Sequence, residues 1–192
     1  MARAALWVDV AVKALLVGLL AFAVARPDLP QFDGKAMAGR AVAYPLVALL
    51  VPAVWYRFGR RRQWAYPFAV DVLVVLPFLI DVAGNAANLY DTISWWDDVN
   101  HLVNWAILVA GFEQVLVRTR LDRWLAASLG IGFGAVTAIL WEILEYFTFI
   151  RNSPERKTAY TDTLGDLSLG LTGSAVAAVA TAVWARRLAL RT

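Results

Sequence analysis

Long apolar runs alternate with short polar breaks along the whole chain. Each run is about 20 residues long, which a helix needs to cross the roughly 30 Å hydrocarbon core of a bilayer. The breaks contain Pro, Gly and charged residues, which end such runs. The pattern predicts six membrane helices, at roughly residues 5–25, 41–57, 65–83, 98–117, 124–149 and 164–185. The expected fold class is all-α: a polytopic integral membrane bundle that forms one transmembrane domain over residues 1–192.

The composition supports a membrane protein and excludes several kinds of site. Hydrophobic residues make up 60% of the chain, above the 45–50% or so of soluble domains. There is no Cys, so disulfides, thiolate metal sites and a cysteine nucleophile are excluded. The chain has a single His, which excludes sites built from several imidazoles. No nucleic-acid-binding module is recognisable, so no nucleic-acid partner is expected.

Basic residues gather in every second loop, which predicts the orientation by the positive-inside rule. The arginines that carry this signal are Arg3, Arg57, Arg60, Arg61, Arg62, Arg118, Arg120, Arg123, Arg186, Arg187 and Arg191. They place both termini in the cytoplasm of a multi-pass protein of the bacterial inner (plasma) membrane. Ala23-Val24-Ala25 resembles a signal-peptidase site, but Asp9 is unusual in a leader, so we expect the first helix to be retained.

Acidic residues gather at the opposite, outer ends of the helices. Glu142 and Glu145 end an apolar run, where a carboxylate costs a few kcal/mol in hydrocarbon and the helix dipole is unfavourable to it. Other polar groups at the same depth are Asp81, Asn85, Asn88, Asp91, Asp97, Asp98, His101, Asp162 and Asp166. Residues three or four apart share a helix face, so these side chains are expected to converge inside the bundle.

Small residues indicate where the helices approach one another. Gly130 and Gly134 lie four residues apart on span five, and Gly170 and Ser174 on span six. Such pairs allow close packing of membrane helices. The carboxylates of span five are therefore expected to face the bundle interior.

Carboxylates held close together either bind protons or share a cation. A site rich in oxygen with one imidazole suits Mg²⁺, Mn²⁺ or Fe²⁺ better than Zn²⁺, and no organic cofactor is indicated. The predicted metal ligands are Asp97, Asp98, His101, Glu142, Glu145, Asp162 and Asp166, with Glu142 and Asp98 as catalytic groups.

Cationic and polar residues near this cluster are candidates for substrate binding. Arg151, Arg156 and Lys157 could hold an anionic group such as a lipid phosphate, or simply form a solvated loop. Asn88 and Tyr146 could orient a substrate or lie at the membrane interface.

Structural roles compete with the metal site. Asp97 or Asp98 could be the N-cap of span four, Thr163 to Asp166 could form a capping box, and His101 could be a structural hydrogen-bonding residue. Toward the inner side, Asp9 and Lys13 form a local i,i+4 ion pair. Three further inner residues, Asp71, Glu113 and Gln114, are expected to pair with Arg57, Arg60 or Arg118.

Three motifs carry a resemblance to a known family. They are Trp96-Asp97-Asp98 with His101, Trp141-Glu142-Ile143 with Glu145, and Asp162-Thr163 with Asp166-Leu167 and Gly170. Over residues 65–175 the chain resembles the YjdF-like family of bacterial inner-membrane proteins. The resemblance implies a fold and a shared polar site, and no established activity.

Three functions fit these observations. The first is a metal-dependent hydrolase or transferase that acts on a membrane lipid or a lipid-linked anionic substrate. The second is a cation or proton transporter or channel, which needs polar groups that continue to the inner face. The third is a non-catalytic subunit of a membrane complex, and a homo-oligomer or a partner subunit is compatible with all three.

Overall fold

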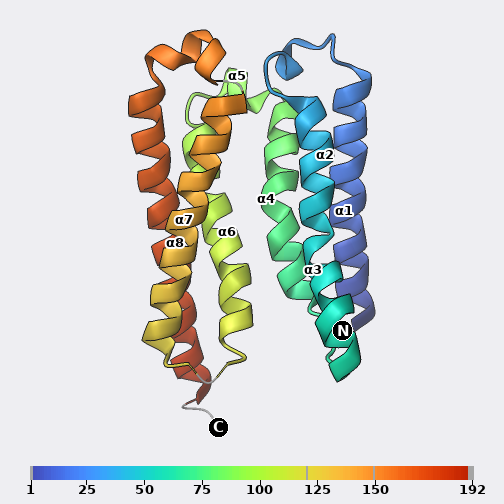
Figure 1. Cartoon of the computed structure of the whole chain (residues 1–192), viewed down its shortest axis with the longest axis vertical. Helices are drawn as coiled ribbons and strands as arrows, with labels where there is room; N and C mark the ends of the chain where they lie inside the picture. The colour runs from blue at the N-terminus through green and yellow to red at the C-terminus, as the bar shows by residue number, and fades with distance from the viewer. Residues whose placement is uncertain (1, 120, 149, 190–192) are drawn as a thin grey trace. The chain divides into compact units, whose positions relative to one another are not determined.

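The computed structural model describes residues 2–119, 121–148 and 150–189, and every regular element in them is helical. The α-helices are α1 (Ala2–Ala25), α2 (Met37–Ala48), α3 (Leu50–Val54), α4 (Phe68–Ala86), α5 (Leu89–Thr92), α6 (Trp96–Leu116), α7 (Arg123–Thr148) and α8 (Ala159–Ala189). They belong to two compact units, Met1–Ile93 (unit 1) and Ser94–Thr192 (unit 2) (Figure 1). The expectation of one transmembrane domain stays a prediction.

Five helical stretches of the described residues are long and apolar enough to cross a membrane. They are Arg3–Ala25, Met37–Arg62, Phe68–Ala86, Arg123–Asn152 and Ala159–Trp184. The all-α membrane class is thereby confirmed. The remaining predicted span corresponds to α6, whose 21 residues include Asp97, Asp98, His101 and Glu113, and these lower its hydropathy. The cytoplasmic placement of the termini stays a prediction. Two of the arginines on which it is based, Arg120 and Arg191, lie outside the described residues.

In unit 1, α1 packs against α4 and α2. One small core there consists of Ala23, Phe32 and Met37. The span predicted over 41–57 lies within the helical stretch Met37–Arg62, in which the α-helix is interrupted at Leu49. Pro52 explains the interruption: its ring is incompatible with the carbonyl four residues earlier, at Ala48. The chain continues as α3 and then as a π-helical turn, Trp55–Gly59, and a 3₁₀ turn, Arg60–Arg62.

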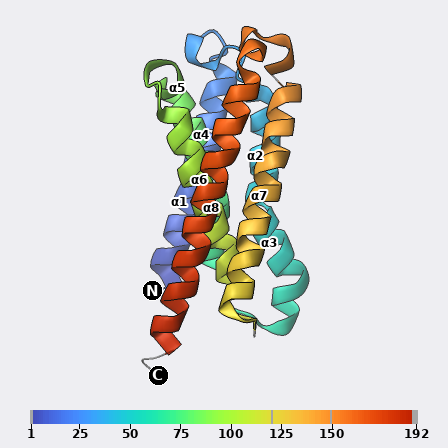
Figure 2. The same cartoon turned by 90° about the vertical axis from the view of Figure 1, so that its left-hand side faces the viewer.

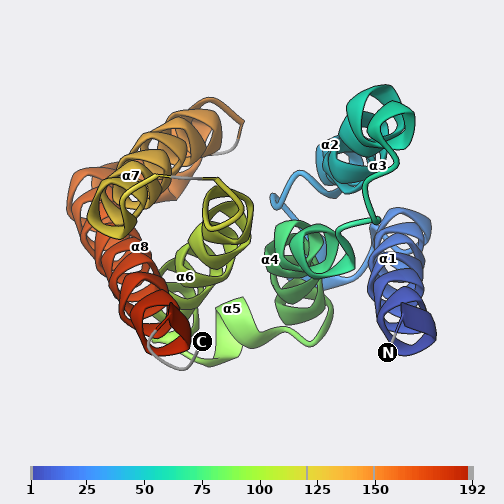
Figure 3. The same ribbon diagram turned by 90° about the horizontal axis from the view of Figure 1, so that it is seen from below.

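In unit 2, α6 and α7 both pack along α8, the longest helix (Figure 2). Viewed end-on, the three helices form a triangular bundle (Figure 3). Small residues set these contacts, as the sequence predicted. A Cβ on Gly134 would lie 2.1 Å from Ser174 Oγ, and a Cβ on Gly173 would lie 2.0 Å from the carbonyl oxygen of Leu102. The α6–α8 contact is therefore made partly by backbone atoms.

Helix α8 begins at Ala159, five residues before the predicted start at 164. The amide of Asp162 already donates to the carbonyl of Thr158, at 3.1 Å, and the intervening polar residues include no Pro or Gly that would stop the helix. Asp162 therefore lies in the first turn and Asp166 inside the helix. The capping box expected at Thr163 to Asp166 is consequently wrong.

We expect Gly173→Ala to destabilise the protein by about 2 kcal/mol, because the new methyl group would overlap the backbone of Leu102. Gly165 is the matched control on the same helix, because no atom lies within 4 Å of a Cβ there. Gly165→Ala should be neutral or stabilising by up to about 1 kcal/mol. Thermal unfolding in detergent, followed by circular dichroism, measures both, and equal midpoints for the two variants would contradict the prediction.

Candidate metal centre

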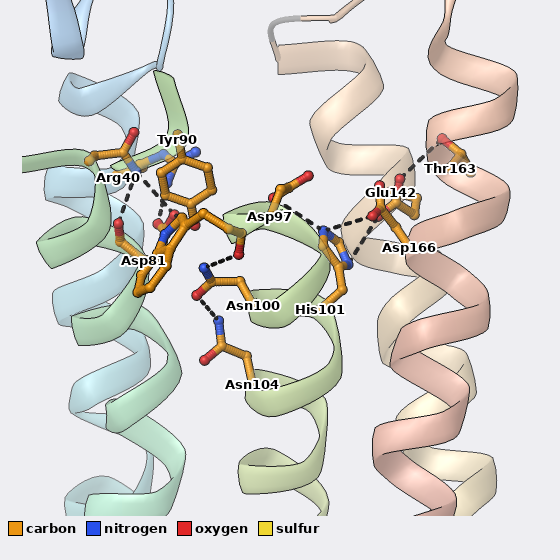
Figure 4. Close-up of polar contacts among 12 residues, drawn as sticks. Arg40, Asp81, Tyr90, Asp97, Asn100, His101, Asn104, Glu142, Thr163 and Asp166 are labelled. Carbon is orange, nitrogen blue, oxygen red and sulfur yellow. Dashed lines mark hydrogen bonds and ion pairs between the residues drawn. The ribbon is translucent and has the colours of Figure 1, made fainter. Parts of the chain in front are cut away.

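His101 lies at the centre of the acidic cluster of unit 2. Its side chain comes from α6 and is 7% exposed. Nδ1 lies 3.8 Å from Oε1 of Glu142 on α7. Nε2 lies 3.7 Å from Oδ1 of Asp166 on α8 and 3.8 Å from Oδ1 of Asp97 on its own helix. Figure 4 shows that both nitrogens of the ring thus face carboxylates.

Two groups of potential metal ligands share this imidazole. The first is Asp97, His101 and Asp166, and the second is His101, Glu142 and Glu145; in each group the ligand atoms lie within 4.8 Å of one another. The separations of 3.7–3.8 Å are too long for hydrogen bonds. Two ligands at about 2.1 Å from one ion are separated by roughly 3.0–3.4 Å. The carboxylates would therefore have to move inward to close either group around an ion.

The helix contacts explain why these residues meet. Asp97 and His101 are four residues apart and share a face of α6. One turn from His101, Trp105 packs against Gly170 of α8, where a Cβ would lie 2.6 Å from the Trp105 ring. This contact holds Asp166, one turn before Gly170, opposite the imidazole.

Glu142 has a second fixed contact. The hydroxyl of Thr163 donates a 3.1 Å hydrogen bond to Glu142 Oε2, so the other oxygen, Oε1, faces His101. Glu142 is 7% exposed. The sequence did not indicate a site role for Thr163, because the expected capping box assigned its hydroxyl to the backbone.

Negative charge exceeds positive charge at this site. Three carboxylates lie within 4 Å of one imidazole, and a protonated imidazole can neutralise only one of them. Asp98 and Asp162 also interact electrostatically with Asp166. Since like charges at this distance repel, the cluster requires additional protons or a cation.

The structure brings five of the seven predicted ligands into the two ligand groups, and Asp98 and Asp162 are not among them. The alternative role of Asp97 or Asp98 as N-cap is wrong, because the N-cap of α6 is Trp95. Both aspartates lie in the first turn instead, where the helix dipole stabilises their charge.

The predicted substrate-binding cations lie between α7 and α8, in the same unit as the metal ligands. Arg151 belongs to the 3₁₀ turn Ile150–Asn152, and Arg156 and Lys157 to the turn Pro154–Lys157. All three are exposed, and the Arg151 guanidinium lies over the Phe147 ring at 5.7 Å. Tyr146 is 38% exposed. Their role in substrate binding stays a prediction.

In unit 1, Asp81 forms a network of its own. Arg40 pairs with its carboxylate, Tyr44 and Tyr90 donate hydrogen bonds of 2.6 and 3.1 Å, and Asn85 donates one of 3.2 Å. The sequence did not identify Arg40 as the partner of Asp81, although a carboxylate inside the predicted span 65–83 requires one.

Asn88 precedes α5 in unit 1. It has a left-handed conformation with φ 59°. Its role as a substrate-binding residue stays a prediction.

A second ionic network of unit 1 is formed by Lys13. Its ammonium lies 3.2 Å from Asp9, as the sequence predicted, and 2.5 Å from Asp71. The expected pairing of Asp71 with Arg57 or Arg60 is wrong, because α1 packs along α4 and brings Lys13 to it. The hydroxyl of Tyr66, which precedes α4, also donates to Asp71. Burial, together with the hydrogen bond and the charge of Asp71, raises the pKa of the Tyr66 phenol above its ordinary range.

Comparison with known proteins identifies a family. The family model described as "Predicted membrane protein (DUF2238)" matches residues 9–187. No match was found among curated proteins or among solved structures. A membrane protein family is thus confirmed, and the narrower YjdF-like resemblance and the bacterial inner membrane stay predictions.

The raised pKa of Tyr66 predicts a pH dependence of stability. Above about pH 10 the phenol ionises in the unfolded chain while it stays protonated in the fold. Its contribution to the free energy of unfolding is therefore complete below that pH and is lost as the pH rises further. We expect Tyr66→Phe to show a weaker fall of the thermal midpoint between about pH 9 and pH 11 than wild type.

Tyr160→Phe is the matched control, because Tyr160 is 80% exposed, and it should retain the wild-type pH dependence. Parallel curves for wild type and Tyr66→Phe would refute the assignment.

Proposed function

Because the chain belongs to the DUF2238 family of predicted membrane proteins, we propose that its buried acidic cluster is a divalent-metal centre at the outer face of the membrane. We further propose that the protein is a metal-dependent hydrolase or transferase that acts on a lipid or a lipid-linked anionic substrate. One observation carries the proposal: carboxylates from three helices surround both nitrogens of one buried imidazole.

The two sides of the ring support different roles. A histidine that binds a metal through one nitrogen usually donates its other N–H to a carboxylate, which fixes the ring. Glu142 is suited to that positioning role, because Thr163 holds one of its oxygens while the other faces Nδ1. The ion then lies on the Nε2 side, with Asp97 and Asp166 as its carboxylate ligands. Glu145 completes the group on the Glu142 side.

This ligand set favours Mg²⁺, Mn²⁺ or Fe²⁺ over Zn²⁺, because carboxylate oxygens outnumber nitrogen. Such an ion polarises a phosphoryl or carbonyl oxygen or activates a water molecule. Asp98 and Asp162 interact electrostatically with Asp166, and we assign them the part of accepting a proton during the reaction.

The surroundings support an amphipathic anionic substrate. Arg151, Arg156 and Lys157 supply exposed positive charge on the segment between α7 and α8, which suits a phosphate or carboxylate head group. The last turns of α7 carry exposed apolar side chains around Glu142, among them Leu140 at 53% and Leu144 at 63% exposure. Acyl chains of the substrate could pack against these positions.

The interior of unit 2 supports an enzyme more than a transporter. Beyond His101, the inward face of α6 carries Trp105 and Val109, which are 9% and 0% exposed. These side chains pack against Gly170 and Gly134, and the buried hydroxyl beside them, that of Ser174, donates to the carbonyl of Gly170 at 2.7 Å. A path for ions through the bundle would need polar groups at this level.

Metal content of the detergent-purified protein tests the centre. Wild type, loaded with divalent metals and freed of excess, should contain about one equivalent by elemental mass spectrometry. His101→Ala and Asp166→Asn should lose it, because each removes a ligand on the Nε2 side. Glu142→Gln should keep the ion with an affinity about 10- to 100-fold weaker, as expected for a residue that orients a ligand.

Asp33→Asn is the control at an exposed acid of unit 1, and it should bind like wild type; circular dichroism confirms that each variant is folded. If wild type contains no metal after loading, the proposed metal centre is overturned. Two equivalents, one of them lost in Glu142→Gln, would replace the positioning role of Glu142 by a second ion site. The reaction class is tested separately with metal-loaded protein and vesicles that contain a phosphate-bearing lipid. Metal binding without turnover of any lipid phosphate would overturn it.

A further inference from the structure

Glu113 is a buried carboxyl that the proposed metal centre does not use. It lies three turns after His101 on α6 and is 1% exposed. Its carboxyl packs against Gly130 of α7, which has no side chain. A Cβ on Gly130 would lie 2.1 Å from Glu113 Oε1 and 3.4 Å from the Cβ of Ala178 on α8. The side chain therefore extends into the space that the missing Cβ leaves between the three helices.

The surroundings of this carboxyl are apolar. Val109, Ala127, Ala178 and Ala182 form the adjoining core cluster. Oε1 has no hydrogen-bond partner among the described residues, and none of their ion pairs includes Glu113. The expected pairing with Arg118 is thus wrong, since that arginine is exposed near the end of α6.

An ionised carboxylate in such a place is very costly. Transfer of a lone charge into an apolar interior costs tens of kcal/mol in the limiting Born estimate, and several kcal/mol after relaxation. A proton removes that cost. Gly130 of α7, on which the carboxyl packs, and Ala178 of α8, beside the same position, carry no titratable side chain, and no ion pair among the described residues supplies a counter-charge to Glu113.

We propose that Glu113 is a proton-binding site, separate from the metal centre, which holds its proton throughout the physiological pH range. The proton exchanges only when the contact between α6 and α7 at Gly130 opens to water. The ligand of this second site is a proton and not a metal ion, because no hydrogen-bonding group of the described residues contacts Glu113 Oε1.

Infrared difference spectroscopy tests the proposal. Full-length wild type and Glu113→Gln are compared at pH 7 and pH 8 in detergent. The difference spectrum should contain the C=O stretching band of one protonated carboxylic acid, unchanged between the two pH values. Gln is nearly isosteric and neutral, so the variant should unfold at or above the wild-type temperature. A carboxylate band in place of the acid band overturns the proposal.

A second measurement needs no variant. A hydrophobic carbodiimide reacts with protonated carboxyl groups inside membranes. Treated wild type is digested, and the adduct is located by mass spectrometry. Modification of Glu113, with no modification of exposed Asp33 under the same conditions, supports the site. A labelling yield at Glu113 that falls more than tenfold between pH 6 and pH 8 counts against it.

Discussion

A carboxylate buried among apolar helices requires a counter-charge, a metal ion or a proton. This constraint organises both units. Asp81 is paired with Arg40, and Asp71 with Lys13, which also contacts Asp9, so the buried acids of unit 1 lie beside basic side chains, one of which two carboxylates share. Among the described residues of unit 2, no such cation pairs with Glu142 or Asp166, whose ion pairs there involve His101 alone. The same physical requirement therefore leads to closed ion pairs in unit 1 and to a site that can accept a ligand in unit 2.

The close packing of α6 against α8 determines the geometry of that site. Gly170 and Gly173 bring α8 against the Trp105 side chain and the Leu102 backbone, directly beside His101 in sequence. A larger residue at either position would separate the helices and move Asp166 away from the imidazole. Packing between small residues thus acts on function as well as on stability, since the distances among ligands depend on backbone approach.

The sequence predicted the helical membrane class from the length of the apolar runs. It predicted the meeting of His101 with Glu142 and Asp166 because these polar groups lie at one depth, where the surrounding hydrocarbon favours their convergence inside the bundle. It did not predict that Arg40 pairs with Asp81 or Lys13 with Asp71. Those contacts depend on which helices pack together, and periodicity carries no such information. The early start of α8 was missed because polar residues such as Asp162 are tolerated in a first helical turn. Pro52 indicated an interruption of the helix near Leu49, but the long apolar run around it favoured one continuous helix.

Helix α6 carries two ionisable side chains in opposite electrostatic environments, one near each end. At its start, His101 lies among several carboxylates, so the local charge is large and can be satisfied by a multivalent ion. Near its end, Glu113 is alone in a core of Val and Ala side chains, so one proton suffices. Trp105 and Val109 lie between them along the helix, and 12 residues of α-helix correspond to about 18 Å. This separation, together with the lack of a charged group on the face that Trp105 and Val109 form, favours two independent sites over a continuous path.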